Sequence, residues 1–262
     1  MCIRNYLTFL FVIIACILTF TNSEYRMVGG SNGQREITPY EITPYLILIR
    51  HDNNNHCVGS LVTSRKVLTA ADCVIGLDTT LFSVVAGLTN VHDNWENGQV
   101  CNVQTVDYPP GYRSNIKHLN IGVMNLDRRI NRVPDIVDAI LLWTLEFGWG
   151  QRMRVGQLGW KYAENGEISN RIRFTDWASL EPRDCEQRCK SPIIDLTPAM
   201  ICASPVTAGG CLVDPGTPSV INGKLYAVAS HYLHDEDYSS PIVFTVVADT
   251  EVREFLDTAL WS

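Results

Sequence analysis

The cysteines are the residues whose type and spacing most directly suggest chemistry. The chain has nine, and two of them, Cys2 and Cys16, lie in an apolar N-terminal segment. The other seven are Cys57, Cys73, Cys101, Cys185, Cys189, Cys202 and Cys211. Zinc sites usually have two close pairs of ligands, whereas only Cys185 and Cys189 are close here. We therefore expect disulfides and no metal or cofactor, and the odd number leaves at least one free thiol or an intermolecular bond.

The N-terminal segment has the pattern of a secretory signal peptide. Arg4 precedes an apolar run from Leu7 to Phe20, and Thr21-Asn22-Ser23 then supplies small residues for a signal peptidase. The run is short for a membrane span, which needs about 20 residues, although a signal anchor is the alternative. We expect residues 1–23 to be removed and the mature chain to be secreted, without a membrane partner, into an oxidising compartment.

Composition and charge exclude two classes of protein. Hydrophobic residues make up 46% of the chain and charged residues 19%, which supplies a core and excludes disorder as the main state. The formal charge is −7, and no run of Lys or Arg is longer than Arg128-Arg129. A nucleic-acid-binding protein needs a concentrated basic face, so nucleic acid is not expected as a partner.

The elements that position these cysteines are predicted to be short β-strands. Strand-like runs rich in β-branched and aromatic residues cover 45–50, 82–87, 100–106 and 225–230. Turn signals stand between such runs, at Asn32-Gly33, Pro109-Pro110-Gly111, Asn165-Gly166 and Asn222-Gly223. The pattern predicts an all-β fold, either antiparallel barrels or a sandwich.

The last segment is the only one with helical spacing. Its apolar residues are Val252, Phe255, Leu256, Ala259 and Leu260. Asp249 or Thr250 is available as the N-cap, so a helix is predicted over 250–261.

Four motifs follow one another in a fixed order. They are Arg26-Met27-Val28-Gly29-Gly30, Val67-Leu-Thr-Ala-Ala-Asp72-Cys73, Asn120-Ile121-Gly122-Val123 and Cys211-Leu-Val213-Asp214-Pro215-Gly216-Thr217-Pro218. They resemble the activation site, the block of the catalytic histidine, the catalytic Asp-Ile-Ala-Leu segment and the nucleophile loop of the trypsin-like serine proteases. Weaker matches at 57–61, 108–112 and Gly159-Trp160 lie between them.

The resemblance covers residues 27–262 and implies the chymotrypsin fold, which is all-β. It implies two antiparallel β-barrels, roughly 27–135 and 136–250, followed by the C-terminal helix 250–261. Residues 24–26 would form a short activation peptide after the signal peptide 1–23. Cleavage after Arg26 would free Met27, whose new amino group the family pairs with the carboxylate at the position of Asp214.

All three positions of the catalytic triad differ from the family pattern. The base position is Asp72, whose carboxylate has an ordinary pKa of about 4 and accepts a proton from an alcohol poorly. The orienting position is Asn120, which carries no charge to stabilise an imidazolium. The nucleophile position is Pro215, which has no functional group. The resemblance therefore predicts a protein without protease activity.

The oxyanion hole is predicted to be lost as well. The family uses the backbone N–H groups of the nucleophile and of a glycine two residues earlier. Pro215 has no N–H, and Val213 replaces the glycine, where it should resist a backbone conformation with positive φ. Losing one donor typically lowers turnover by about 10²–10³-fold.

Six histidines are the candidates for a relocated base. They are His51, His56, His92, His118, His231 and His234. His56 and His118 lie near the motifs, and His231 follows Ser230 where the family has Ser-Trp-Gly. A relocated nucleophile would also need a relocated oxyanion hole, so we interpret all six as surface or packing residues. Residues 209–211 read Gly-Gly-Cys, which lacks the family's Asp at the base of a pocket for basic side chains.

The scaffold cysteines match the family better. The resemblance implies a bridge between Cys57 and Cys73, and a second bridge that joins Cys202 to either Cys185 or Cys189. Cys101, Cys211 and the remaining member of the pair have no assigned partner, because no cysteine follows Cys211.

The resemblance thus implies a secreted, catalytically inactive serine protease homologue that acts by binding proteins. Such homologues act as cofactors or decoys in proteolytic cascades. The short activation segment resembles that of a digestive trypsin ancestor, and we therefore expect the inactivated protease paralogues of parasitic mites, which bind and dampen host complement, to be close relatives. Extracellular proteins, complement among them, are the expected partners. The alternatives are a decoy that binds through the old cleft, and an endopeptidase with residual activity.

Overall fold

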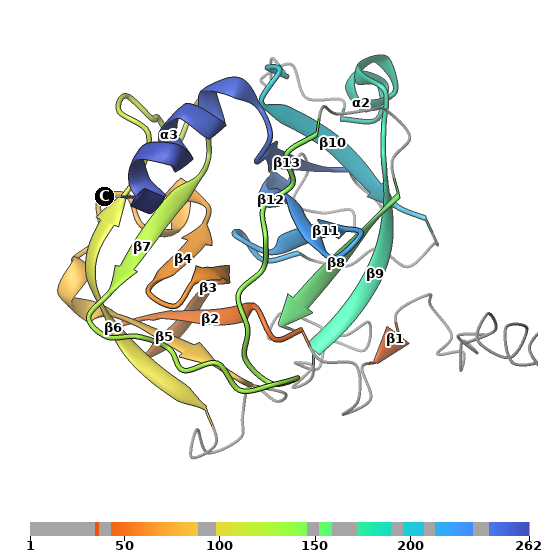
Figure 1. Ribbon diagram of the computed structural model, residues 1–262. Helices are drawn as coiled ribbons and strands as arrows, with labels where there is room; N and C mark the ends of the chain where they lie inside the picture. Colours follow the sequence, from red (N-terminus) through yellow and green to blue (C-terminus); the bar gives the residue numbers. More distant parts are fainter. Residues whose placement is uncertain are drawn as a thin grey trace, which may run out of the picture.

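The chain is seen in a computed structural model, which describes residues 35–36, 43–88, 98–145, 152–158, 172–189, 196–206, 213–232 and 241–261 (Figure 1). Two β-barrels lie side by side, and a helix at the C-terminus packs across the first of them. The barrels predicted from the sequence are confirmed, and the sandwich that the strand pattern alone left open is not formed.

The first barrel has six strands, and all neighbouring pairs are antiparallel. They are β2 (Leu46–His51), β3 (Asn54–Thr63), β4 (Lys66–Thr69), β5 (Phe82–Ala86), β6 (Gln99–Asp107) and β7 (Gly122–Leu126), and they close in the order β2-β3-β4-β7-β6-β5. Alternation sets the inward face. In β6, Cys101 and Val103 are buried while Asn102 and Gln104 are exposed. The strands predicted over 45–50, 82–87 and 100–106 correspond to β2, β5 and β6.

The second barrel is built from β8 (Arg152–Leu158), β9 (Ile172–Ser179), β10 (Met200–Pro205), β11 (Pro218–Ile221), β12 (Lys224–Tyr232) and β13 (Ile242–Val246). Its order is β9-β10-β13-β12-β11-β8, and pairing of β8 with β9 closes the ring. The short strand β1 (Arg35–Glu36) adds to β9 outside the ring. The predicted turn at Asn222-Gly223 joins β11 to β12, and both residues have positive φ, as a tight hairpin turn requires.

The C-terminal helix α3 (Thr250–Trp261) occupies the predicted range. Asp249 is its N-cap, because its side-chain oxygen accepts the N–H groups of Glu251 at 3.0 Å and Val252 at 3.3 Å. The helix buries Val252, Leu256 and Ala259 in an apolar cluster that also contains Leu68 and Val123 of the first barrel and Leu225 and Val228 of the second. The helix therefore helps to hold the barrels together.

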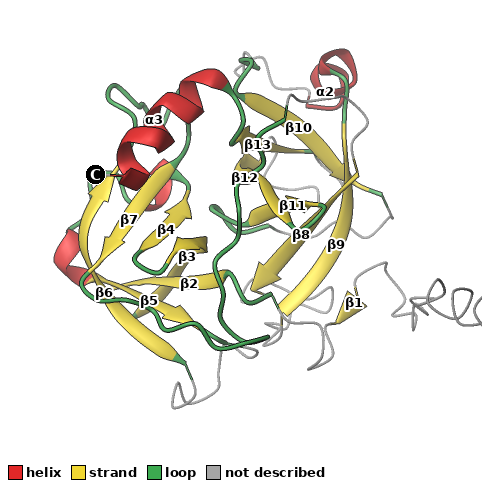
Figure 2. Ribbon diagram, in the orientation of Figure 1, coloured by secondary structure: helices red, strands yellow, loops and turns green. Residues whose placement is uncertain are grey.

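A second helix, α2 (Pro182–Cys189), corrects the expectation that only the last segment is helical (Figure 2). Its sequence, Pro-Arg-Asp-Cys-Glu-Gln-Arg-Cys, has no apolar stripe from which a helix could be predicted. A disulfide holds it instead, because Cys185 is bonded to Cys202 of β10. Two short 3₁₀ turns, η1 (Ala71–Cys73) and η2 (Thr79–Leu81), are the remaining elements of the described residues.

The two disulfides agree with the bridges that the resemblance implies. Cys57 of β3 is bonded to Cys73 of η1, and Cys202 is bonded to Cys185 rather than to Cys189. Cys101 is a free thiol buried in the core of the first barrel. Cys211 lies outside the described residues, as does the side chain of Cys189.

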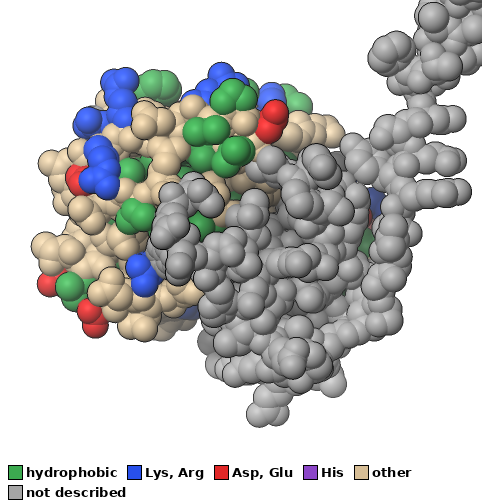
Figure 3. Space-filling view, turned by 90° about the horizontal axis from the view of Figure 1, so that it is seen from below, with side chains coloured by type: hydrophobic (Ala, Val, Ile, Leu, Met, Phe, Trp, Pro, Cys, Tyr) green, Lys and Arg blue, Asp and Glu red, His purple; other side chains and the backbone are tan. Residues whose placement is uncertain are grey.

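The described surface is of mixed character. Seen from below, it has basic, acidic and apolar side chains interspersed over the part of that face that is coloured (Figure 3). Among the described residues, no helix has the length and apolar character needed to cross a bilayer.

Candidate functional site

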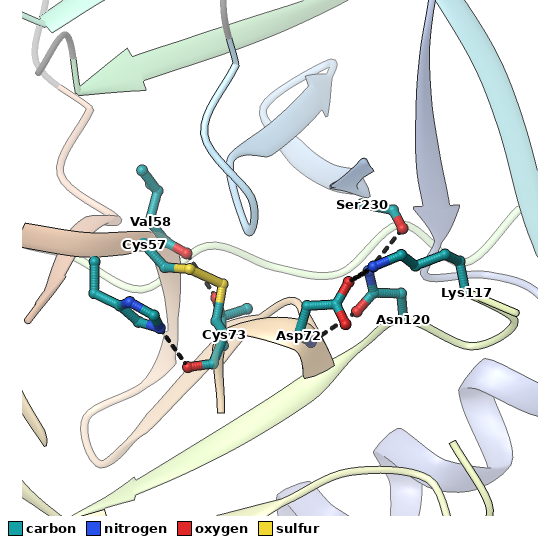
Figure 4. Close-up of a disulfide and its surroundings, with 9 residues drawn as sticks. Cys57, Val58, Asp72, Cys73, Lys117, Asn120 and Ser230 are labelled. Atoms are coloured by element: carbon teal, nitrogen blue, oxygen red, sulfur yellow. Dashed lines mark hydrogen bonds and ion pairs between the residues drawn. A yellow bond between two sulfur atoms is a disulfide. The ribbon is translucent and has the colours of Figure 1, made fainter. Parts of the chain in front are cut away.

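The residues at the three expected triad positions lie on loops and turns of both barrels. Asp72 lies in η1, directly after β4 of the first barrel, and Asn120 stands just before β7. Pro215 lies in the loop that leads into β11 of the second barrel. The structure thus brings Asp72 and Asn120 together as the motif spacing predicts (Figure 4).

Asn120 is fully buried and uses both ends of its amide. Its Nδ2 donates to Oδ2 of Asp72 at 3.0 Å and to Oγ of Ser230 at 2.7 Å. Its Oδ1 accepts the backbone N–H of Asp72 at 3.0 Å. An amide suits this place, because it donates to a carboxylate on one side and accepts from a backbone N–H on the other.

Two residues that the sequence analysis missed complete the surroundings of Asp72. The ammonium of Lys117 forms an ion pair with Oδ2 of Asp72, and the hydroxyl of Ser114 donates to Oδ1. Lys117 Nζ and Ser114 Oγ are 3.3 Å apart. The signal that could have suggested Lys117 is a cation three residues before the orienting position, in a chain where the base position carries a carboxylate.

These contacts set the charge of Asp72. Burial alone would raise the pKa of its carboxyl, but the hydrogen bonds from Lys117 and Ser114 and the charge of Lys117 outweigh burial, so that the pKa lies below its usual value. Burial and the negative charge of Asp72 raise the pKa of the neighbouring Tyr112, which stays a neutral phenol. At neutral pH the site therefore contains a carboxylate already neutralised by an ammonium, which is a poor proton acceptor.

His231 lies at the edge of the same cluster. Its Nδ1 is 2.8 Å from Oγ of Ser230. Burial, assisted by the charge of Lys117, lowers the pKa of His231 to about 4, so the ring is neutral at neutral pH. Ser230 is only 2% exposed, which keeps its hydroxyl from reaching a substrate.

The other histidines lie elsewhere or outside the described part. His56 Nε2 is 2.9 Å from the carbonyl oxygen of Cys73, and His51 packs on Phe82. His118 lies between Thr197 at 3.0 Å and Glu251 at 3.3 Å. These positions agree with packing and surface roles, while His92 and His234 fall outside the described residues.

The loop of Pro215 is held by backbone contacts. The carbonyl of Pro215 accepts the N–H of Val58 at 3.1 Å, and the N–H of Gly216 donates to Ala229 at 2.8 Å. Gly216 has φ +84°, and a Cβ there would come within 2.0 Å of the carbonyl oxygen of Val58. The loop is thus pressed against β3, where Pro215 offers neither a hydroxyl nor an N–H.

Val213 and Asp214 are both buried just before this proline. Val213 is 2% exposed and belongs to the apolar core of the second barrel. Because residue 212 lies outside the described residues, the backbone conformation expected at Val213 stays a prediction. Asp214 is 1% exposed. Arg26, Met27 and the segment 209–211 also lie outside the described part, so the activation switch and the altered pocket stay predictions.

The sequence is similar to a known family of proteins. The family model described as Trypsin matches residues 31–253. Among curated proteins, the chain is 32% identical over 215 residues to trypsin zeta of Drosophila erecta, covering 78% of this chain and 75% of that protein. It is 29% identical over 209 residues to a trypsin of Saccharopolyspora erythraea, covering 78% of this chain and 86% of that protein.

Solved structures give the same fold. Human heparin binding protein superposes with a TM-score of 0.71 at 24% identity, covering 88% of this chain and 97% of that one. A scabies mite inactivated protease paralogue superposes with a TM-score of 0.73 at 21% identity, covering 87% and 97%. Mouse neuropsin, a serine protease, gives 0.72 at 22% identity, covering 87% and 98%.

Proposed function

The chain belongs to the trypsin family, and we propose that it is a secreted member without protease activity that acts by binding other proteins. The observation that carries the proposal is the pairing of Asp72 with Lys117 at the base position, opposite a proline at the nucleophile position. A serine protease needs a hydroxyl to attack the carbonyl and a neutral base to take its proton. Neither group stands at its position in this chain.

The size of the expected loss supports inactivity. Removing the nucleophile or the base of a comparable protease lowers turnover by on the order of 10⁶-fold. Loss of one oxyanion donor, taken by itself, lowers turnover by about 10²–10³-fold. These losses overlap rather than multiply, but either one is enough to abolish useful catalysis.

A hydroxyl near the site offers no substitute. Ser114 is exposed and lies 3.3 Å from Lys117 Nζ, an arrangement that resembles a Ser–Lys pair. A lysine acts as a base only when it is neutral, and the Lys117 ammonium is already engaged in an ion pair with the carboxylate of Asp72. The alternative of residual hydrolysis is therefore disfavoured.

Binding through the outer surface is favoured over a decoy that uses the old cleft. The polar groups of Asp72, Asn120 and Ser230 already bond to one another, so they have little left to offer a substrate chain. A scabies mite inactivated protease paralogue has the same fold, which supports an inactive member of the family. Extracellular proteins of a proteolytic cascade, complement components first, are the partners we propose.

Two measurements test the proposal on the mature chain 27–262. Labelling with a fluorophosphonate probe should be absent, with Ser114→Ala, which removes the exposed hydroxyl beside Lys117, as the matched control for contaminating proteases. Labelling of the natural chain that exceeds the control would overturn inactivity. Binding to purified complement components should be saturable and insensitive to an excess of a cleft-directed trypsin inhibitor. Competition by that inhibitor would favour the decoy, and no binding to any component would remove the proposed partner class.

A further inference from the structure

Asn120 links elements of both barrels. Its side chain bonds to Asp72 of η1 in the first barrel and to Ser230 of β12 in the second. Its backbone carbonyl accepts the hydroxyl of Thr245, on β13, at 3.2 Å. One buried residue thus connects three elements, at the place where a protease of this fold would carry out its chemistry.

Asp72 is largely buried and needs compensation for its charge. Its side chain is 18% exposed and that of Lys117 is 25% exposed, so solvent screens the pair only in part. The groups that face Asp72 from the neighbouring elements are Lys117 and Ser114, the phenol of Tyr112 and, from β12, His231. Lys117 is the one cation among them at neutral pH, and without it the carboxylate would lack an ionic partner among the groups named.

The segment that carries Lys117 has an unfavourable backbone. Lys117 has φ +60° and Leu119 has φ +56°, a region that non-glycine residues adopt at a cost. Such conformations persist when the surrounding contacts fix them. Here the contacts lie at both ends. The Lys117 ammonium binds Asp72, and Leu119 packs into the apolar cluster under α3.

We propose that Asp72, Lys117 and Asn120 form a polar joint that fixes the segment 113–120 and the second barrel to η1. The joint turns the former base and orienting positions into a structural contact. It also makes Lys117 a further obstacle to catalysis, because an imidazole at position 72 would face an ammonium. That ammonium opposes the imidazolium that a catalytic histidine must become.

A double-mutant cycle tests the joint. Asp72→Asn and Lys117→Met should each raise the unfolding equilibrium constant by about tenfold, because each leaves a partly buried partner unpaired. The double variant should be little worse than either single one. The exposed pair Arg132–Asp138, 2.8 Å apart, is the matched control, and its cycle should show almost no coupling. Additive effects at Asp72 and Lys117 would overturn the joint.

A measurement on the natural chain covers the case in which a variant fails to fold. NMR titration should find the carboxyl of Asp72 ionising below the usual range of aspartate, and its amide N–H protected from exchange by Asn120. Limited proteolysis should leave the segment 113–120 uncut at neutral pH. An ordinary titration of Asp72, together with rapid cleavage within 113–120, would overturn the proposal.

Discussion

The two sides of the candidate site are held by different forces. On the first barrel, Asp72 and Asn120 are held by charge and side-chain hydrogen bonds. On the second, Pro215 and Gly216 are held by backbone hydrogen bonds and steric fit, next to the buried Val213. The loss of stability from a substitution on the first side should therefore vary with pH. On the second side the loss should depend on the volume of the new side chain and on the backbone angle that it must adopt.

The largest effect should come from Gly216→Ala. A Cβ would meet the carbonyl oxygen of Val58 at 2.0 Å and would also sit at φ +84°. We expect a loss of at least about 3 kcal/mol in the free energy of unfolding, independent of pH. Urea denaturation measures it. The matched control is Gly223→Ala, where φ is +73° but no atom lies within 4 Å, and where strain alone should cost about 1–2 kcal/mol. Equal losses in the two variants would mean that the close approach of Val58 adds nothing to the strain of the positive φ.

The disulfides allow the next comparison at nearly constant loop length. Cys57–Cys73 and Cys185–Cys202 close loops of sequence separation 16 and 17. Chain entropy alone predicts about 3 kcal/mol for each. We expect replacement of the first bridge by two alanines to cost more, because it ties β3 to η1 beside Asp72 and the Pro215 loop. Thermal unfolding of the two double-alanine variants checks this. An equal cost would mean that the bridge contributes nothing to the site beyond entropy.

Asn120→Asp, on the first side of the site, should give a protein whose stability falls as the pH rises. A second carboxylate would face Oδ2 of Asp72 at 3.0 Å and have its pKa raised by that charge. A group with a raised folded pKa adds stability below its unfolded pKa and loses it as the pH rises. We expect the variant to be about 2 kcal/mol less stable at pH 7, and to recover toward pH 4. Urea midpoints across this range measure the effect.

The control for this change is Asn125→Asp. Asn125 also donates to a carboxylate, that of Asp107 at 2.6 Å, but at a half-exposed position of β7. Solvent should screen the new charge there, so its cost should be smaller and less dependent on pH. A response as large as that of Asn120→Asp would show that the position between the barrels has no special role.

Much of the fold could be predicted from the sequence, because strands and turns carry local signals. β2, β5, β6, β12 and α3 all follow from runs of apolar residues. The proximity of Asp72 and Asn120 follows from motifs whose spacing the family preserves. The contact of Lys117 with Asp72 could not be predicted, since the two are 45 residues apart and Lys117 reaches its partner through an irregular segment. Helix α2 and the choice of Cys185 over Cys189 depend on how a polar segment meets β10, which no hydrophobic pattern records.

The smallest effect is expected from reverting the triad itself. Asp72→His, Asn120→Asp and Pro215→Ser together should give turnover of peptide esters little above that of buffer. The new histidine would face the Lys117 ammonium, and Val213 would still occupy the glycine position of the oxyanion hole. Adding Val213→Gly and Lys117→Leu should raise the rate further, because the first change addresses the steric side of the site and the second the electrostatic side. Each should raise the rate without the other, since oxyanion stabilisation still accelerates the reaction when nucleophile activation is impaired. Steady-state assays of the three-, four- and five-fold variants measure these rates. Ordinary trypsin-like rates from the triple reversion alone would show that neither the charge of Lys117 nor the side chain of Val213 prevents catalysis.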